Sequence, residues 1–250
     1  MIGKELIAVL RETHLDDTKL PYLWSDPELL RNINYAEVQA CRRAHLLIDS
    51  STANDSGTAG TASTMGQRPL CTLSITAGTA TYNLSLKVLQ IRRCQLGSMT
   101  YPLNGPLTYP ALDDYASGWM GTAGSIGTAG SGGYPWGFLN QPGNTITFIQ
   151  APSASDTAYL IVSRLPLVPI TLQSAPEIDE QYHIDILDWA AHLAFMKPDS
   201  DTQDLNLAKV YEDRFTQKFG PLPDAYSERM RKTLLQRTRM RPREFGSEPR

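Results

Sequence analysis

Apolar residues recur at helical spacing near both ends of the chain and at a spacing of two in its middle. The first pattern predicts a short amphipathic helix over residues 2–12 and a second, of about six turns, that begins near residue 25 and runs to 48. The same spacing returns after residue 179 and predicts two further helices, one closed by Pro198 and the other ended by Gly220 and Pro221. Each of these helices has an apolar face that needs a partner.

The middle of the chain has the period of strands. LCTLSITAGTATYNLSL, from residue 70, predicts two strands around a turn near Ala77 and Gly78, and KVLQIRRCQL predicts a third. NTITFIQAP and TAYLIVSRLP predict two more, the last ended by Pro166. We therefore expect a β-rich module between the helical segments.

Two helix starts carry capping signals. In SDPE, Ser25 is expected to cap the helix and Glu28 to reach back to it, with Pro27 in the first turn. Ser200 and Gln203 repeat this capping box before the last helix.

Small, polar, glycine-bearing stretches separate the patterned regions, and GTAG occurs three times in them without forming a structural repeat. The predicted fold class is α+β: a helical bundle built from both chain ends, with an inserted β-rich module and an extended C-terminal arm. The expected segments are 1–49, N-terminal helices of the bundle; 50–66, a flexible linker; 67–170, the β-rich inserted module; 171–221, C-terminal helices of the bundle; and 222–250, the basic C-terminal arm.

The composition indicates the broad class of the protein and its cellular compartment. The chain has 250 residues, 41% of them hydrophobic and 20% charged, which is typical of a folded soluble protein of one or two domains. The three cysteines are odd in number and lack metal-ligand spacing, which favours a reduced cytosol over a disulfide framework. The N-terminal sequence reaches acidic residues before it forms the apolar core of a signal peptide, and no apolar run approaches the ~20 residues of a membrane span. We expect no membrane association.

Charge is unevenly distributed. The net charge is −3, but residues 227–250 carry eight basic and three acidic side chains, so this arm is +5 and the rest of the chain is −8. Phosphate contact, docking on an acidic protein groove and a merely solvated end all fit such an arm, and the interleaved apolar residues favour protein docking. The residues expected to dock are Arg229, Arg231, Lys232, Leu234, Leu235, Arg237, Arg239, Arg241 and Arg243.

One group of residues invites a metal interpretation. Asp185, Asp188 and His192 fall on one polar stripe of a mostly apolar helix, and a carboxylate and histidine four residues apart can share a cation. The ligand set is incomplete, so an ion-pair or packing stripe at a helix or subunit interface is the favoured interpretation. The acids at 199–204 lack the glycine and glutamate of a calcium loop.

No catalytic residue, metal site or cofactor is predicted. The sequence has no G-x-S-x-G, P-loop or C-x-x-C motif, and its four histidines stand outside catalytic signatures. Aromatic residues of the middle module fit sheet packing better than stacking on sugars or bases. We therefore expect a protein that is not an enzyme.

Longer stretches resemble a known family. LDDTKLPYLWSDPELLRNINYAEVQACRRAHLLID is similar to the N-terminal signature of tailed-bacteriophage head-to-tail adaptor (connector) proteins, in which a D-D-x(5–6)-W-S-x-x-E-L turn leads into a long helix. GNTITFIQAPSASDTAYLIVSRLP resembles their strand pair, and HIDILDWAAHLAFMKPDSDTQDLNLAKVYEDRFTQKFGP resembles their second helical half. The resemblance covers most of the chain except the GTAG loops and the arm.

The resemblance implies a structural virion protein. Such adaptors form a homo-oligomeric ring, typically of twelve subunits, beneath the portal protein, and connect the capsid to a downstream tail or nozzle protein. DNA is transiting cargo, which an acidic body suits because a basic wall would hold phosphates. The implied location is the virion neck, after assembly in the host cytoplasm. The alternative is a binding module whose β insertion engages capsid, fibre or glycan.

Overall fold

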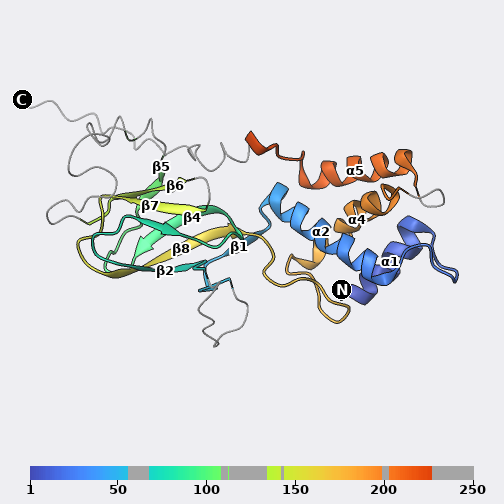
Figure 1. Ribbon diagram of the computed structural model, residues 1–250, viewed down its shortest axis with the longest axis horizontal. Coiled ribbons are helices and arrows are strands. Elements are labelled where there is room, and N and C mark those ends of the chain that lie inside the picture. The colour runs from blue at the N-terminus through green and yellow to red at the C-terminus, as the bar shows by residue number, and fades with distance from the viewer. Residues whose placement is uncertain (56–67, 108–111, 113–133, 142–143, 199–202, 227–250) are drawn as a thin grey trace, which may run out of the picture.

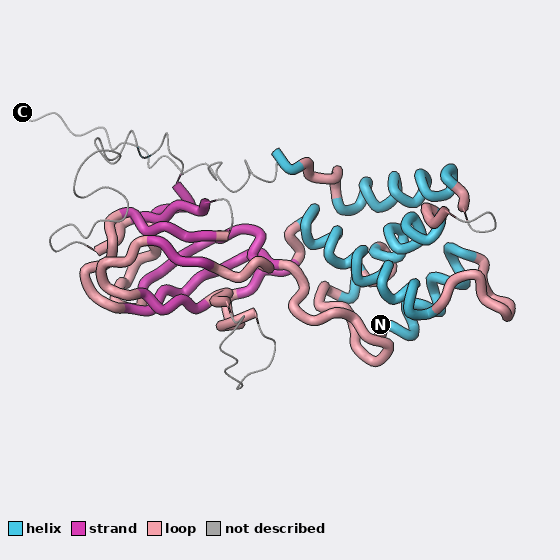
Figure 2. The backbone as a smooth tube through the Cα atoms, in the orientation of Figure 1, coloured by secondary structure: helices cyan, strands magenta, loops and turns pink. Residues whose placement is uncertain are grey.

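The computed structural model describes residues 1–55, 68–107, 112, 134–141, 144–198 and 203–226. These residues form two lobes, one helical and one made of strands, that lie end to end along the long axis of the molecule (Figure 1). The chain starts in the helical lobe, passes through the β lobe and returns, as the colouring by element makes clear (Figure 2).

The helical lobe has four described α-helices around one core. Leu6, Leu10, Leu29 and Ile33 from the N-terminal part and Phe215 from the C-terminal part are all buried in the same hydrophobic cluster. α4 lies between α2 and α5 in this cluster, and α1 is only two turns long. The helices are α1 (Gly3–Leu10), continued by a π-helical turn (Arg11–Leu15), α2 (Asp26–Ala44), α4 (Ile186–Phe195) and α5 (Leu205–Phe219).

The β lobe has two sheets that enclose a second core. Phe138 and Phe148 from one sheet meet Ile91, Leu160 and Val162 from the other, and all five are buried. In the first sheet β8 (Asp156–Arg164) is central and pairs antiparallel with β1 (Leu47–Asp49), β2 (Thr72–Ile75) and β4 (Val88–Leu96). The second sheet has the order β3 (Thr81–Asn83), β7 (Thr145–Ile149), β6 (Gly137–Gln141) and β5 (Asn104–Leu107).

The predicted fold class is wrong. The described chain is a mixed α/β fold with four helices and two sheets, and it is not a regular helical bundle built from both chain ends. All the strands lie between the two helical segments of the chain: β1 follows α2 almost directly and pairs with β8, the strand that leads back to the helices. Apolar stripes show that a helix buries one face, but they do not specify the partner or the crossing geometry.

The second helix is shorter than predicted. It ends at Ala44, where His45 adopts a left-handed conformation with φ of 51°, and Leu47 and Ile48 belong to β1. The two strands around Gly78 join different sheets, since β2 pairs with β8 and β3 pairs with β7. A two-residue period marks strands without naming the strand they pair with.

Candidate functional site

A buried arginine holds the loop that contains the D-D and W-S residues of the signature. The Arg11 guanidinium donates hydrogen bonds to the carboxylate of Asp17, to the carbonyl oxygen of Trp24 at 2.6 Å and to Asp26 Oδ1 at 2.7 Å. The Asp17 carboxylate also accepts from the backbone N–H groups of Leu23, at 3.0 Å, and Trp24. The motif is therefore a brace that closes loop 16–25 onto the helix before it.

Trp24 fixes the same loop to the far part of the chain. Its buried indole meets Phe195 edge to face, with ring centroids 5.8 Å apart, and its Nε1–H donates to the carbonyl oxygen of Ala194 at 3.3 Å. Sequence reasoning missed Arg11 as the centre of this brace. The available signal was a cation on the apolar side of the first predicted helix, five residues before two aspartates.

The polar stripe of α4 faces α5 and the π-helical turn. Lys218 Nζ contacts the Asp185 carboxylate and lies 3.9 Å from Asp188 Oδ2, and Asp188 Oδ1 lies 3.3 Å from Nε2 of His14. His192 donates from Nδ1 to the carbonyl oxygen of Ala208 at 2.9 Å, so its partner is the backbone of α5. The three residues thus lie at a contact between helices of one chain, and in the part of the chain that the structure describes no group of three His, Cys, Asp or Glu residues is placed to hold a metal ion.

A polar network joins the two lobes. Arg164, at the end of β8, donates from Nε to Asp49 Oδ2 at 2.7 Å and from Nη1 to Glu177 Oε2 at 2.5 Å. Glu177 Oε1 accepts from the backbone N–H groups of Leu167 and Val168, each at 2.7 Å. Arg164 therefore fastens the return connection to the strand that leaves α2.

Glu37 of α2 continues this network into the helical lobe. Its Oε1 accepts from the backbone N–H of Glu177 at 2.7 Å and from that of Ile178 at 3.4 Å. Burial raises the pKa of the Glu37 carboxyl to about 7, against the opposing effect of these two hydrogen bonds. Burial also acts to raise the pKa of Asp49, but hydrogen bonds from Thr52, Ser51 and Arg164 outweigh it and hold that pKa well below its usual value.

The helix caps differ from those predicted. Ser25 is the N-cap residue of α2, but its side chain makes no capping hydrogen bond, and the Glu28 carboxylate accepts from Lys197 Nζ at 3.1 Å instead of reaching back. At α5 the N-cap is Asp204, whose side chain accepts from the backbone N–H groups of Asn206 and Leu207. Gln203 therefore lies just before this cap, and Ser200 is outside the described residues. The predicted capping box at Ser25 is not formed, because Glu28 pairs with Lys197, which follows the end of α4.

The predicted arm residues, from Arg229 to Arg243, lie outside the described residues. The last described segment ends at residue 226, shortly after Gly220 terminates α5 with a φ of 89°. Arg43 of α2 donates to the carbonyl oxygen of Gly220 and to Thr216 Oγ1, each at 3.1 Å, and so fixes the point from which the chain continues.

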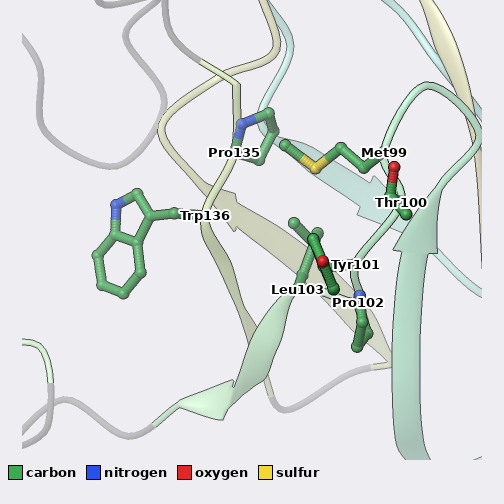
Figure 3. A pocket seen from close by; sticks show the side chains of 7 residues that line it. All are labelled: Met99, Thr100, Tyr101, Pro102, Leu103, Pro135 and Trp136. Atoms are coloured by element: carbon green, nitrogen blue, oxygen red, sulfur yellow. The ribbon is translucent and has the colours of Figure 1, made fainter.

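A shallow cavity of about 250 Å³ opens on the β lobe. Figure 3 shows the seven side chains around it, with Trp136 pointing away from the others. Its lining is mainly apolar, so it suits an apolar or aromatic group better than a charged ligand. The lining residues are Met99, Thr100, Tyr101, Pro102, Leu103, Pro135 and Trp136.

The cysteine thiols are buried and held in their neutral form. Cys41, Cys71 and Cys94 are all buried, and burial raises the pKa of each thiol to about 12. None of the described helices is long and apolar enough to cross a bilayer.

Ion pairs brace the loop after the first helix and the joint between the lobes, and several large apolar side chains are exposed on both lobes. The chain belongs to the SU10 adaptor protein family, whose model matches residues 1–243. This match confirms the resemblance to phage adaptors and identifies a bacteriophage structural adaptor protein. The family implies a component of the virion neck that interacts with capsid or portal proteins and with tail proteins. Among curated proteins, none matches the sequence.

Proposed function

We propose that the protein is a head-to-tail adaptor that forms a ring, of twelve subunits, under the portal and lets DNA pass from capsid to tail. The observation that carries this proposal is the family match, which spans both lobes and extends into the arm. The protein acts through contacts and not through catalysis, with the portal above it and a tail or nozzle protein below it.

Charge supports the same function. Residues 1–226 carry a net charge of −8, and an acidic surface around a channel releases DNA instead of binding its phosphates. The arm has the opposite sign, with seven arginines and one lysine. Arginine binds carboxylates in a bidentate manner better than lysine does, so the arm suits an acidic protein groove on the portal.

The segments expected from the sequence can each be given a role in such an adaptor. The helices within 1–49 and 171–221 provide the helical body, and 67–170 provides the β module, which Leu47–Asp49 joins as β1. Residues 50–66 are a linker, and 222–250 are the arm that reaches the portal. Fully extended, the 24 residues from 227 to 250 span up to ~80 Å, which is enough to cross from one ring to the next.

The test measures assembly with the portal. Native mass measurement of the protein, with and without portal rings, should give a closed multiple of the subunit mass. Deleting residues 227–250 should leave a folded protein that no longer joins portal rings. A variant with every arginine of the arm changed to lysine is the matched control, since it keeps the charge and loses only bidentate binding.

Two outcomes would contradict the proposal. A truncated chain that joins portal rings with undiminished affinity would show that the arm is not the docking segment. Binding of the arm to DNA with a steep dependence on salt would replace the protein groove by phosphates as its target.

The cavity of the β lobe favours a second candidate function. Its apolar and aromatic lining is suited to a protein side chain or a sugar ring, as expected of a module that engages capsid, fibre or glycan. Tyr101→Ala, which removes an exposed aromatic side chain from the lining, would then weaken attachment of that partner and leave ring formation unchanged.

A further inference from the structure

An exposed apolar segment projects from the end of the helical lobe. Residues 18–23 are all exposed, and three of them are large and apolar: Leu20 is 78% exposed, Leu23 52% and Tyr22 45%. We call residues 18–23 the apolar finger. Figures 1 and 2 show the connection between α1 and α2 at the end of the helical lobe that is remote from the sheets. Clustered exposed apolar side chains are typical of a contact surface.

The finger is held in one conformation from its base. Asp17, directly before it, and Trp24, directly after it, are both bonded to Arg11, and Trp24 is also packed on α4. The Tyr22 ring lies under the Arg11 guanidinium, 4.0 Å from its carbon to the ring centroid. A loop that is ordered before it binds loses less conformational entropy on docking. The brace therefore prepares the finger for a partner.

A complementary surface lies on α2 of the same chain. Tyr35 is 56% exposed, and Arg31, one turn before it on the same face of the helix, is exposed as well. Two exposed carboxylates precede the finger: Glu12 in the π-helical turn and Asp16, two residues before the finger begins. An apolar tip preceded by acidic residues thus matches an aromatic side chain beside a guanidinium.

The two surfaces are separated within one molecule. The finger ends just before α2, and Tyr35 lies ten residues beyond its N-cap, which is ~15 Å along the helix axis. The Arg11 brace and the Trp24 packing hold the finger beyond the N-terminal end of α2. Only a second copy of the chain brings a finger onto this face.

We infer that the apolar finger of one subunit docks on the Arg31 and Tyr35 face of α2 in the next subunit. The inference rests on the proposed ring and specifies its lateral contact. The contact joins two different patches, so each subunit has both a finger and a docking face. A head-to-tail contact of this kind forms a closed ring when the rotation from one subunit to the next divides a full turn evenly.

Site-specific cross-linking tests this contact in the assembled particle. The three native cysteines are buried, with pKa values of about 12, so cysteines introduced at the surface are the ones that react. In rings assembled with portal, the double variant Leu20→Cys/Tyr35→Cys and a short bis-maleimide should give a ladder of covalent oligomers that stops at the ring number. Either single variant should stay a monomer. The control pair Leu20→Cys/Leu86→Cys places the second thiol on an exposed position of the β lobe and should give no ladder.

A charge reversal provides an independent measurement. Arg31→Glu should raise the concentration needed for ring formation by roughly tenfold, because it places a carboxylate opposite Glu12 and Asp16. Adding Glu12→Arg to that variant should restore assembly, and both positions are exposed, so the fold is retained.

The possible outcomes distinguish failure of the proposed contact from failure of the proposed ring. Rings of full mass without a ladder, or with an equal ladder from the control pair, overturn the contact and leave the proposed ring intact. A chain that stays monomeric with and without portal overturns both. If changing Leu20, Tyr22 and Leu23 to serine abolishes portal binding while the ring still forms, the finger docks on the portal and the inference is wrong.

Discussion

Replacing Glu37 by glutamine should make the protein more stable in alkaline solution and remove most of the dependence of its stability on pH between about 5 and 8. Glu37 is only 1% exposed, and burial raises its pKa from 4.5 to about 7. Glutamine has nearly the same shape and keeps an oxygen that accepts the hydrogen bonds from Glu177 and Ile178. The variant therefore removes the titration and retains the contact.

The sign and the magnitude follow from linkage. Between pH 4.5 and about 7 the folded protein holds the Glu37 proton more tightly than the unfolded chain does, so stability falls as pH rises through this window. At ~1.4 kcal/mol per pKa unit, the shift from 4.5 to about 7 corresponds to ~3 kcal/mol between the ends of the window. Above it, Glu37→Gln should be the more stable protein by an amount of this order, less the cost of burying the amide N–H groups.

Urea denaturation at a series of pH values measures this difference. The free energy of unfolding of the native protein should fall toward pH 8 relative to that of Glu37→Gln, and the two profiles should converge or cross at about pH 5. Glu180→Gln is the matched control, because that side chain is 81% exposed and its replacement should leave the profile parallel to that of the native protein. Parallel profiles for Glu37→Gln would refute the reasoning, since they would show that another group titrates in this window.

Three further changes test the ion pairs that brace the fold. Arg11→Met should lower the free energy of unfolding by about 3–5 kcal/mol, because it leaves Asp17 as an unpaired buried carboxylate, whereas Lys19→Met on the exposed finger should change it by less than ~0.5 kcal/mol. Asp188→Ala should lower the free energy of unfolding by about 1–3 kcal/mol, because it removes the partner of His14. Elemental analysis should find the same metal content before and after this change. One zinc per chain that is lost with Asp188→Ala, or with His192→Ala, would contradict the ion-pair interpretation. Arg164→Met should speed proteolytic cleavage between residues 165 and 178, since it frees Glu177 and Asp49 from the joint, and an unchanged cleavage rate would show that the joint does not depend on this arginine.

The sequence by itself determined the local elements and the class of the protein. The apolar periods indicated the helices that the structure places at 26–44, 186–195 and 205–219 and the long strands at 88–96 and 156–164, because burial of one face imposes a period that a single segment displays. The ends were less well placed, since the second helix was predicted to run to 48 and the third to begin near 179. Short strands such as β1 and β5 escaped notice, since three or four residues are too few to show a period. The motifs of the adaptor family were also legible, and the family match confirms them.

Only the tertiary structure decided which segments meet. Arg11 and Asp17 are close in sequence, but Glu37 binds the backbone at residue 177 and Arg164 binds Asp49, contacts that span more than a hundred residues. A charged residue in a sequence shows that it needs a partner if it is buried, and it does not show whether it is buried or which partner it finds. The expected helical bundle was wrong for the same reason, because an apolar stripe is satisfied equally by a bundle and by a helical lobe joined to two sheets. The partners depend on the packing of the whole chain, which no local pattern encodes.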